Sequence, residues 1–82
     1  MKSKESKEHE KIEERKLAVL KGIVERRNEL GISQMDLALL IGMSFNGYFK
    51  VETGKTKLDT ERLFLLLEKL NISPKNFFKK IE

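Results

Sequence analysis

Residues 34–51, with the sequence QMDLALLIGMSFNGYFKV, decide how this chain folds. Their pattern predicts two short helices joined by a tight turn at Gly42, because glycine readily takes the positive φ that such a turn requires. Ala38 is small enough to let the two helices cross closely. The segment therefore predicts a closely packed pair of helices, whose inward-pointing side chains are Leu37, Ile41, Tyr48 and Val51.

The sequence before this segment changes character near residue 17. Residues 1–16 are rich in Lys, Arg and Glu and cannot bury enough apolar surface to fold alone. We expect this part to be disordered at its start and helical from near Ile12. From Leu17 onward, apolar residues recur at helical spacing until Gly31 ends that helix. The chain thus divides into a charged N-terminal extension, residues 1–16, disordered or helical, and a folded domain, residues 17–82.

Two more helices are predicted after the segment. A loop at residues 55–58 leads to a fourth helix, which opens at Asp59 or Thr60 and ends at Asn71. Pro74 lies where the first turn of a short fifth helix tolerates it. Nothing in the pattern indicates a strand or an internal repeat, so the predicted fold class is all-α, a bundle of five helices.

Composition excludes several classes of function. The 82 residues suffice for one small domain, with no room for a cleft between two domains. The absence of Cys and the presence of a single His exclude disulfides, thiolate zinc sites and two-histidine sites. No apolar run approaches the ~20 residues that span a bilayer, and no signal peptide is evident. We therefore expect a cytoplasmic protein that is not an enzyme, with no metal, no cofactor, no membrane contact and no small-molecule substrate.

Two short helices that cross at a small residue are typical of a helix-turn-helix. At these residues the chain resembles the Cro and Xre family of phage and bacterial repressors. The resemblance includes Ser33-Gln34 before the second helix, Val51-Glu52-Thr53-Gly54-Lys55 after the third, and Leu70-Asn71-Ile72-Ser73 near the end. It covers about residues 17–81 and implies a five-helix fold that presents its third helix to the major groove of double-stranded DNA.

The resemblance implies a role for each matching position. Gln34, at the positive end of the second helix, would bond a backbone phosphate. Arg27 and Glu52 match a pair that forms a salt bridge in some members. Asn suits adenine and Lys suits guanine in the major groove, which agrees independently with DNA readout. The predicted base-edge residues are Phe45, Asn46 and Lys50, the predicted phosphate contacts in the loop are Lys55, Thr56 and Lys57, and Ser44 and Phe49 complete the DNA-binding set.

The resemblance and the basic net charge of +4 predict a sequence-specific DNA-binding transcriptional regulator that represses by occupying its operator. Phe45 and Phe49 depart from the family pattern, in which polar or small residues are usual. This aromatic stripe has two interpretations: contact with thymine methyl groups, or contact with a protein, as in an antitoxin or adapter of the same fold. Tyr48 replaces the more usual Ile or Val, so its hydroxyl is expected to have a hydrogen-bond partner.

We also expect a homodimer. One recognition helix touches only a few base pairs, whereas two-fold dimers read two half-sites about one turn of DNA apart. The fourth and fifth helices carry apolar residues that have no obvious position in the core. We therefore expect the dimer contact on these two helices, centred on Phe78. Two alternatives remain, namely that the N-terminal extension covers these residues through Ile12, or that dimers form only on DNA. The predicted interface residues are Phe64, Leu65, Phe77, Phe78 and Ile81.

Overall fold

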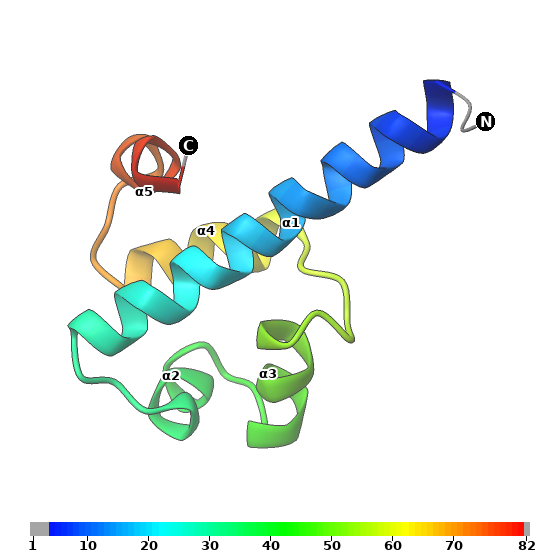
Figure 1. Ribbon diagram of the computed structural model, residues 1–82. Coiled ribbons are helices and arrows are strands. Elements are labelled where there is room, and N and C mark those ends of the chain that lie inside the picture. Colours follow the sequence, from blue (N-terminus) through cyan, green and yellow to red (C-terminus); the bar gives the residue numbers. More distant parts are fainter. Residues whose placement is uncertain (1–3, 82) are drawn as a thin grey trace.

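A computed structural model describes residues 4–81 of the chain, with side chains described from Lys7 onward. Residues 4–81 form five helices and no strand, which confirms the all-α prediction. Residues 1–3 of the predicted extension and Glu82 lie outside the described residues. The helices, shown in Figure 1, are α1 (Lys4–Glu29), α2 (Gln34–Leu40), α3 (Phe45–Glu52), α4 (Thr60–Lys69) and α5 (Pro74–Ile81).

Helix α1 is much longer than the others. Its 26 residues span about 39 Å at a rise of about 1.5 Å per residue. In Figure 1 its C-terminal half lies across the other helices and its N-terminal half projects beyond them. The helix begins at Lys4 rather than near Ile12, because Lys, Glu and Arg favour helix even without tertiary contacts. Ile12 and Leu17 are 54% and 62% exposed, so Leu17 does not belong to the core-facing side of α1.

The core forms where all five helices meet. The residues expected to point inward around the turn are buried, which confirms that prediction, and Leu66 and Leu67 of α4 and its C-cap Leu70 are buried with them. Helix α1 contributes Ile23 to the same cluster, and α5 contributes Phe77. The buried apolar residues are Ile23, Leu37, Ala38, Ile41, Tyr48, Val51, Leu66, Leu67, Leu70 and Phe77.

Left-handed residues end the first four helices. Gly31, Gly42 and Gly54 have φ of 68°, 72° and 80°, and Asn71 has φ of 52°. Glycine takes this conformation without strain, and asparagine is among the few other residues that visit it often. The predicted helix ends are therefore confirmed. At the start of α4 the Asp59 carboxylate accepts a hydrogen bond from the Arg62 backbone N–H at 2.7 Å, so Asp59 is the cap and α4 opens at Thr60.

Helix α5 packs directly on α1, and this packing corrects the predicted dimer interface. Phe77 is 1% exposed and belongs to the core, so its place in the interface was wrong. Ile81 is half-buried and packs against the same core, which makes it a core-edge residue. The reason lies at Gly22, where an added Cβ would stand 2.7 Å from Ile81 Cγ2 and 3.0 Å from Phe77 Cε1. The missing side chain at Gly22 provides the space that both residues fill.

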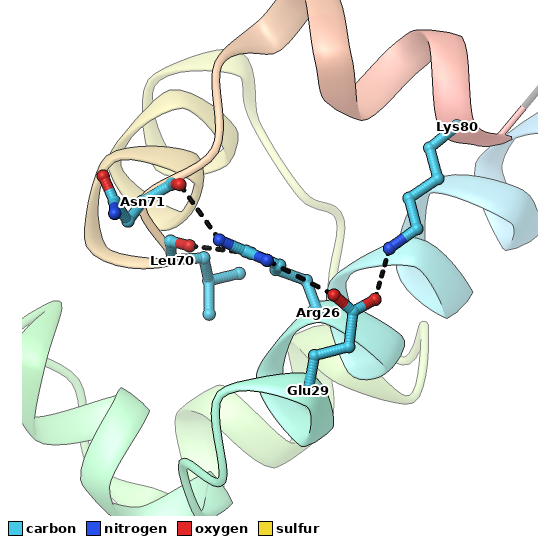
Figure 2. Close-up of polar contacts among 5 residues, drawn as sticks. All are labelled: Arg26, Glu29, Leu70, Asn71 and Lys80. Atoms are coloured by element: carbon cyan, nitrogen blue, oxygen red, sulfur yellow. Dashed lines mark hydrogen bonds and ion pairs between the residues drawn. The ribbon is translucent and has the colours of Figure 1, made fainter.

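A polar network joins α1 to the ends of α4 and α5, as Figure 2 shows. Arg26 donates from Nε to the Leu70 carbonyl at 2.9 Å and from Nη2 to the Asn71 carbonyl at 3.1 Å. Carbonyls at the C-terminal end of a helix lack partners within the helix, so this guanidinium caps α4. Glu29 accepts from Arg26 Nη1 at 3.3 Å and pairs with Lys80 of α5. The Arg26 hydrogen bonds therefore tie α1 to the end of α4, and the exposed Glu29–Lys80 pair links α1 to α5.

Candidate nucleic-acid interface

The turn between α2 and α3 fixes the start of α3. The Met43 backbone N–H donates to the Ala38 carbonyl at 2.8 Å, and the Ser44 hydroxyl accepts from the Gly47 backbone N–H at 3.0 Å. An added Cβ at Gly47 would lie 3.0 Å from the Ser44 hydroxyl oxygen and would crowd this cap. Glycine is therefore used inside α3 even though it costs about 1 kcal/mol of helix propensity relative to alanine.

Helix α3 has one buried face and one exposed face. Tyr48, Val51 and Glu52 point into the protein. The residues predicted from the sequence to reach base edges share the opposite face with Phe49, and all of them are exposed. The rings of Phe45 and Phe49 stack there, with centroids 6.2 Å apart and planes inclined by 27°. The exposed face of α3 therefore carries Phe45, Asn46, Phe49 and Lys50.

The loop after α3 is held against the last turn of that helix. The backbone N–H groups of Lys55 and Thr56 both donate to the Lys50 carbonyl, at 2.8 and 3.1 Å. Lys55, Thr56 and Lys57 are exposed. The structure thus brings the predicted phosphate contacts of the loop next to the exposed face of α3, where they extend a positively charged surface.

A further cation joins this surface from α1. A hollow of about 380 Å³ separates α1 from the loop, and its lining includes Lys16 and Leu20 on one side and Thr56 and Lys57 on the other. Lys16 was missed by the sequence analysis, which placed it at the end of a charged extension. Helical spacing could have placed Lys16 on the same face of α1 as Leu20, because the two residues are four positions apart. Lys16 Nζ also lies 3.0 Å from Glu13 Oε1, an exposed pair that contributes little to stability.

Arg27 and Glu52 form a buried ion pair between α1 and α3. Arg27 Nη2 lies 2.8 Å from Glu52 Oε1, and Arg27 Nε lies 3.2 Å from Glu52 Oε2, so the pair is bidentate. Their side chains are only 11% and 4% exposed. Gln34 Nε2 donates to Glu52 Oε1 at 3.1 Å, and Arg27 Nη1 donates to the Ile32 carbonyl at 3.0 Å. The cluster therefore ties α1 and the start of α2 to the end of α3.

The environment of Glu52 favours its charged form. Burial alone would raise the pKa of the Glu52 carboxyl, because a low-dielectric surrounding disfavours charge. Hydrogen bonding, chiefly from the Arg27 guanidinium, outweighs this effect and holds the pKa of the Glu52 carboxyl below its ordinary value. Burial, together with the neighbouring Glu52 carboxylate, raises the pKa of the Tyr48 hydroxyl far above its ordinary value. That hydroxyl has no hydrogen-bond partner in the described part of the chain, so the expected partner is absent there.

Two findings concern other kinds of site. Within residues 4–81, no group of three or more His, Cys, Asp or Glu side chains is arranged to hold a metal ion. No helix in the same range has the length and apolar character needed to cross a membrane.

Comparison with known proteins gives one match. A family model described as helix-turn-helix matches residues 23–77, which is more than half of the chain and contains α2, the turn, α3 and α4. Neither the comparison with curated proteins nor the comparison with solved structures gave a match. The family match covers the buried pair, the exposed face of α3 and the basic loop described above. The chain therefore belongs to the Cro/C1-type helix-turn-helix family of DNA-binding regulators.

Proposed function

We propose that the protein is a sequence-specific double-stranded DNA-binding regulator that acts in the cytoplasm and represses transcription by occupying its operator. The observation that carries this proposal is the exposed face of α3, with Asn46 and Lys50 beside a loop that contains Lys55 and Lys57. The major groove admits an α-helix, and its base edges offer the partners that such side chains bind. A protein bound there excludes other proteins from the same stretch of DNA.

Each polar residue of the site has a role that its free groups allow. The Asn46 amide matches adenine, and the Lys50 ammonium matches the O6 and N7 acceptors of guanine. Ser44 accepts a bond from Gly47 but retains its own O–H for a phosphate. Gln34 Nε2 uses one hydrogen on Glu52 and retains a second. The remaining phosphate contacts that we propose are Lys55, Thr56 and Lys57, with Lys16 across the hollow.

Base contacts and phosphate contacts should respond differently to substitution. We expect Asn46→Ala and Lys50→Ala each to cost about 1–3 kcal/mol on the matched site and little on a scrambled site, because each removes contacts with one base pair. Lys57→Ala should weaken both sites alike, because phosphates carry no sequence information. Selection from a random DNA pool supplies the matched site, and dissociation constants on both duplexes provide the measurement.

The contrast between the variants makes this experiment decisive. An equal loss on both sites for Asn46→Ala would remove that residue from direct readout. A selection that enriches no sequence would contradict the proposed function itself and would leave the fold as a protein-interaction module, such as an antitoxin or an adapter. The stacked Phe45 and Phe49 rings are the observation that favours this second function.

We propose a homodimer that forms through α4 and α5. Phe64, Leu65 and Phe78 are 50%, 38% and 37% exposed, although all three are large apolar residues. A hollow of about 380 Å³ between the end of α4 and the start of α5 includes Phe64 and Pro74 in its lining. An exposed ring beside a hollow on the same surface is suited to the self-complementary contact of a two-fold dimer.

A charge within this surface should separate the protomers. We expect Phe78→Glu to convert the dimer to a monomer, because the interface would then bury an unpaired carboxylate. Light scattering over a range of concentrations, with and without a palindromic site, measures the change.

Leu17→Glu is the control, because it places the same charge at an exposed apolar position of α1 and should leave the mass unchanged. Dissociation by Ile12→Glu instead would favour the N-terminal extension as the contact. A wild-type monomer that binds one half-site as tightly as the palindrome would contradict dimerisation.

A further inference from the structure

The Phe45 and Phe49 rings form one apolar surface on the face of α3 that we assign to DNA. They stack across one helical turn with centroids 6.2 Å apart, and they remain 40% and 38% exposed. Asn46 and Lys50, the residues after each ring, are also exposed. An apolar pair next to an amide and an ammonium is expected to meet a partner that combines apolar and polar groups within a few ångströms.

The edges of the bases in the major groove offer one apolar group, the C5 methyl of thymine. The other groups exposed there are hydrogen-bond donors and acceptors, which suit Asn46 and Lys50 and leave a phenyl ring without a partner. Placing either ring against those polar edges would cost their hydration without a compensating bond. Thymine methyl groups are therefore the occupants that match the two rings.

The spacing of the rings limits which thymines they reach. Successive bases of one strand rise by about 3.4 Å, so a separation of 6.2 Å between ring centroids corresponds to about two base steps. We propose that Phe45 and Phe49 together read the methyl groups of two thymines that lie within two steps of each other in each half-site. This inference rests on the proposed function and specifies the class of operator.

The local structure fixes the backbone that carries both rings before DNA binds. Phe45 is the first residue of α3 and follows the Ser44 cap, whose hydroxyl accepts from Gly47 at 3.0 Å. The Phe49 carbonyl accepts from the Thr53 backbone N–H at 3.0 Å and from the Thr53 hydroxyl at 2.7 Å. Because the backbone at both residues is already ordered, it loses little conformational freedom on binding, which favours affinity.

The test removes only the methyl group. Random-pool selection with the full chain supplies a duplex, and each thymine in it is replaced singly by deoxyuridine, which differs only by lacking that methyl. We expect two positions per half-site, no more than two steps apart, at which deoxyuridine weakens binding by about three- to fivefold, the effect expected for one buried carbon. At the position that faces Phe45, Phe45→Ala should abolish the difference between thymine and deoxyuridine, and Phe49→Ala should do so at the other.

The exposed apolar substitution Leu17→Ala on α1 is the matched control and should leave both methyl effects intact. A selected site at which no deoxyuridine changes the dissociation constant would overturn the inference while leaving DNA binding established. Methyl effects that persist unchanged in Phe45→Ala and Phe49→Ala would also overturn it. A chain that selects no sequence would overturn the proposed function and this inference together, so the two failures are distinguishable.

Discussion

Replacing Glu52 with glutamine is expected to lower the free energy of unfolding by about 3–5 kcal/mol, because it leaves the buried Arg27 guanidinium without its counter-charge. The two side chains are 11% and 4% exposed, and their bidentate contact joins α1 to α3. In a domain of this size the loss corresponds to a fall in Tm of more than about 10 °C. Thermal and denaturant unfolding followed by circular dichroism measure it.

Glu29→Gln provides the matched control, because Glu29 also pairs with an arginine but is exposed. Its contacts with Arg26 and Lys80 lie at the surface, where ion pairs contribute little, so only a small loss is expected. A fall in Tm of a degree or two for Glu52→Gln, equal to that of Glu29→Gln, would show that the buried pair contributes no more to folding stability than an exposed pair. The same result would argue that water reaches Arg27 once the carboxylate is gone.

Acid provides a second test of the same pair. The pKa of Glu52 is lower in the folded protein than its ordinary value of 4.5, so the folded state stays ionised where the unfolded chain takes up a proton. The stability that this carboxylate contributes is therefore fully present at pH values above the ordinary pKa of 4.5. It is lost as the pH falls through the lower pKa of the folded state. Glu52→Gln should lack this component. Lys80 also holds the pKa of Glu29 below its ordinary value, but this effect is common to both proteins and cancels in the comparison.

The parts of the fold that depend on local chemistry could be predicted from the sequence. A glycine or an asparagine after each of the first four helices predicts a left-handed residue, and all four positions have positive φ. The inner faces of α2 and α3 followed from helical spacing, because a short amphipathic helix leaves one side for the core. The pairing of Arg27 with Glu52 was available only from the family resemblance, since nothing local links residues 25 positions apart.

The parts that depend on how distant helices meet could not be predicted. Phe77 and Phe78 are adjacent, and their spacing alone does not decide which one faces α1. The decision lies in Gly22, more than fifty residues earlier, whose missing side chain gives Phe77 and Ile81 their place. Lys16 lies on the same hollow as Lys57 for a similar reason, because the two meet there only once α1 and the loop have packed together. Where predictions failed, the missing information was a contact between helices.

Raising salt from about 50 to about 200 mM is expected to weaken DNA binding by about 10³-fold, the largest effect that the site predicts. Lys16, Lys55 and Lys57 border one surface in each protomer, and a dimer would present two such sets to the phosphates. Each neutralised phosphate adds about 0.9 to the slope of log K against log salt, so six contacts give a slope near −5. Fluorescence anisotropy on the selected duplex, titrated at several salt concentrations, measures this slope.

Single lysine substitutions then identify the contacts. Lys57→Ala should make the slope shallower by about 1.8, because a dimer loses two phosphate contacts, and Lys16→Ala should do the same if α1 reaches the DNA. Lys69→Ala is the matched control, since this exposed lysine lies in the last turn of α4, at the end of the helix away from the loop. Its slope should equal that of the wild type. Two results would show that the basic loop does not contribute to DNA binding: a wild-type slope that is flat over this range, or a slope that Lys57→Ala leaves unchanged. Contacts from α3 would then have to account for the affinity.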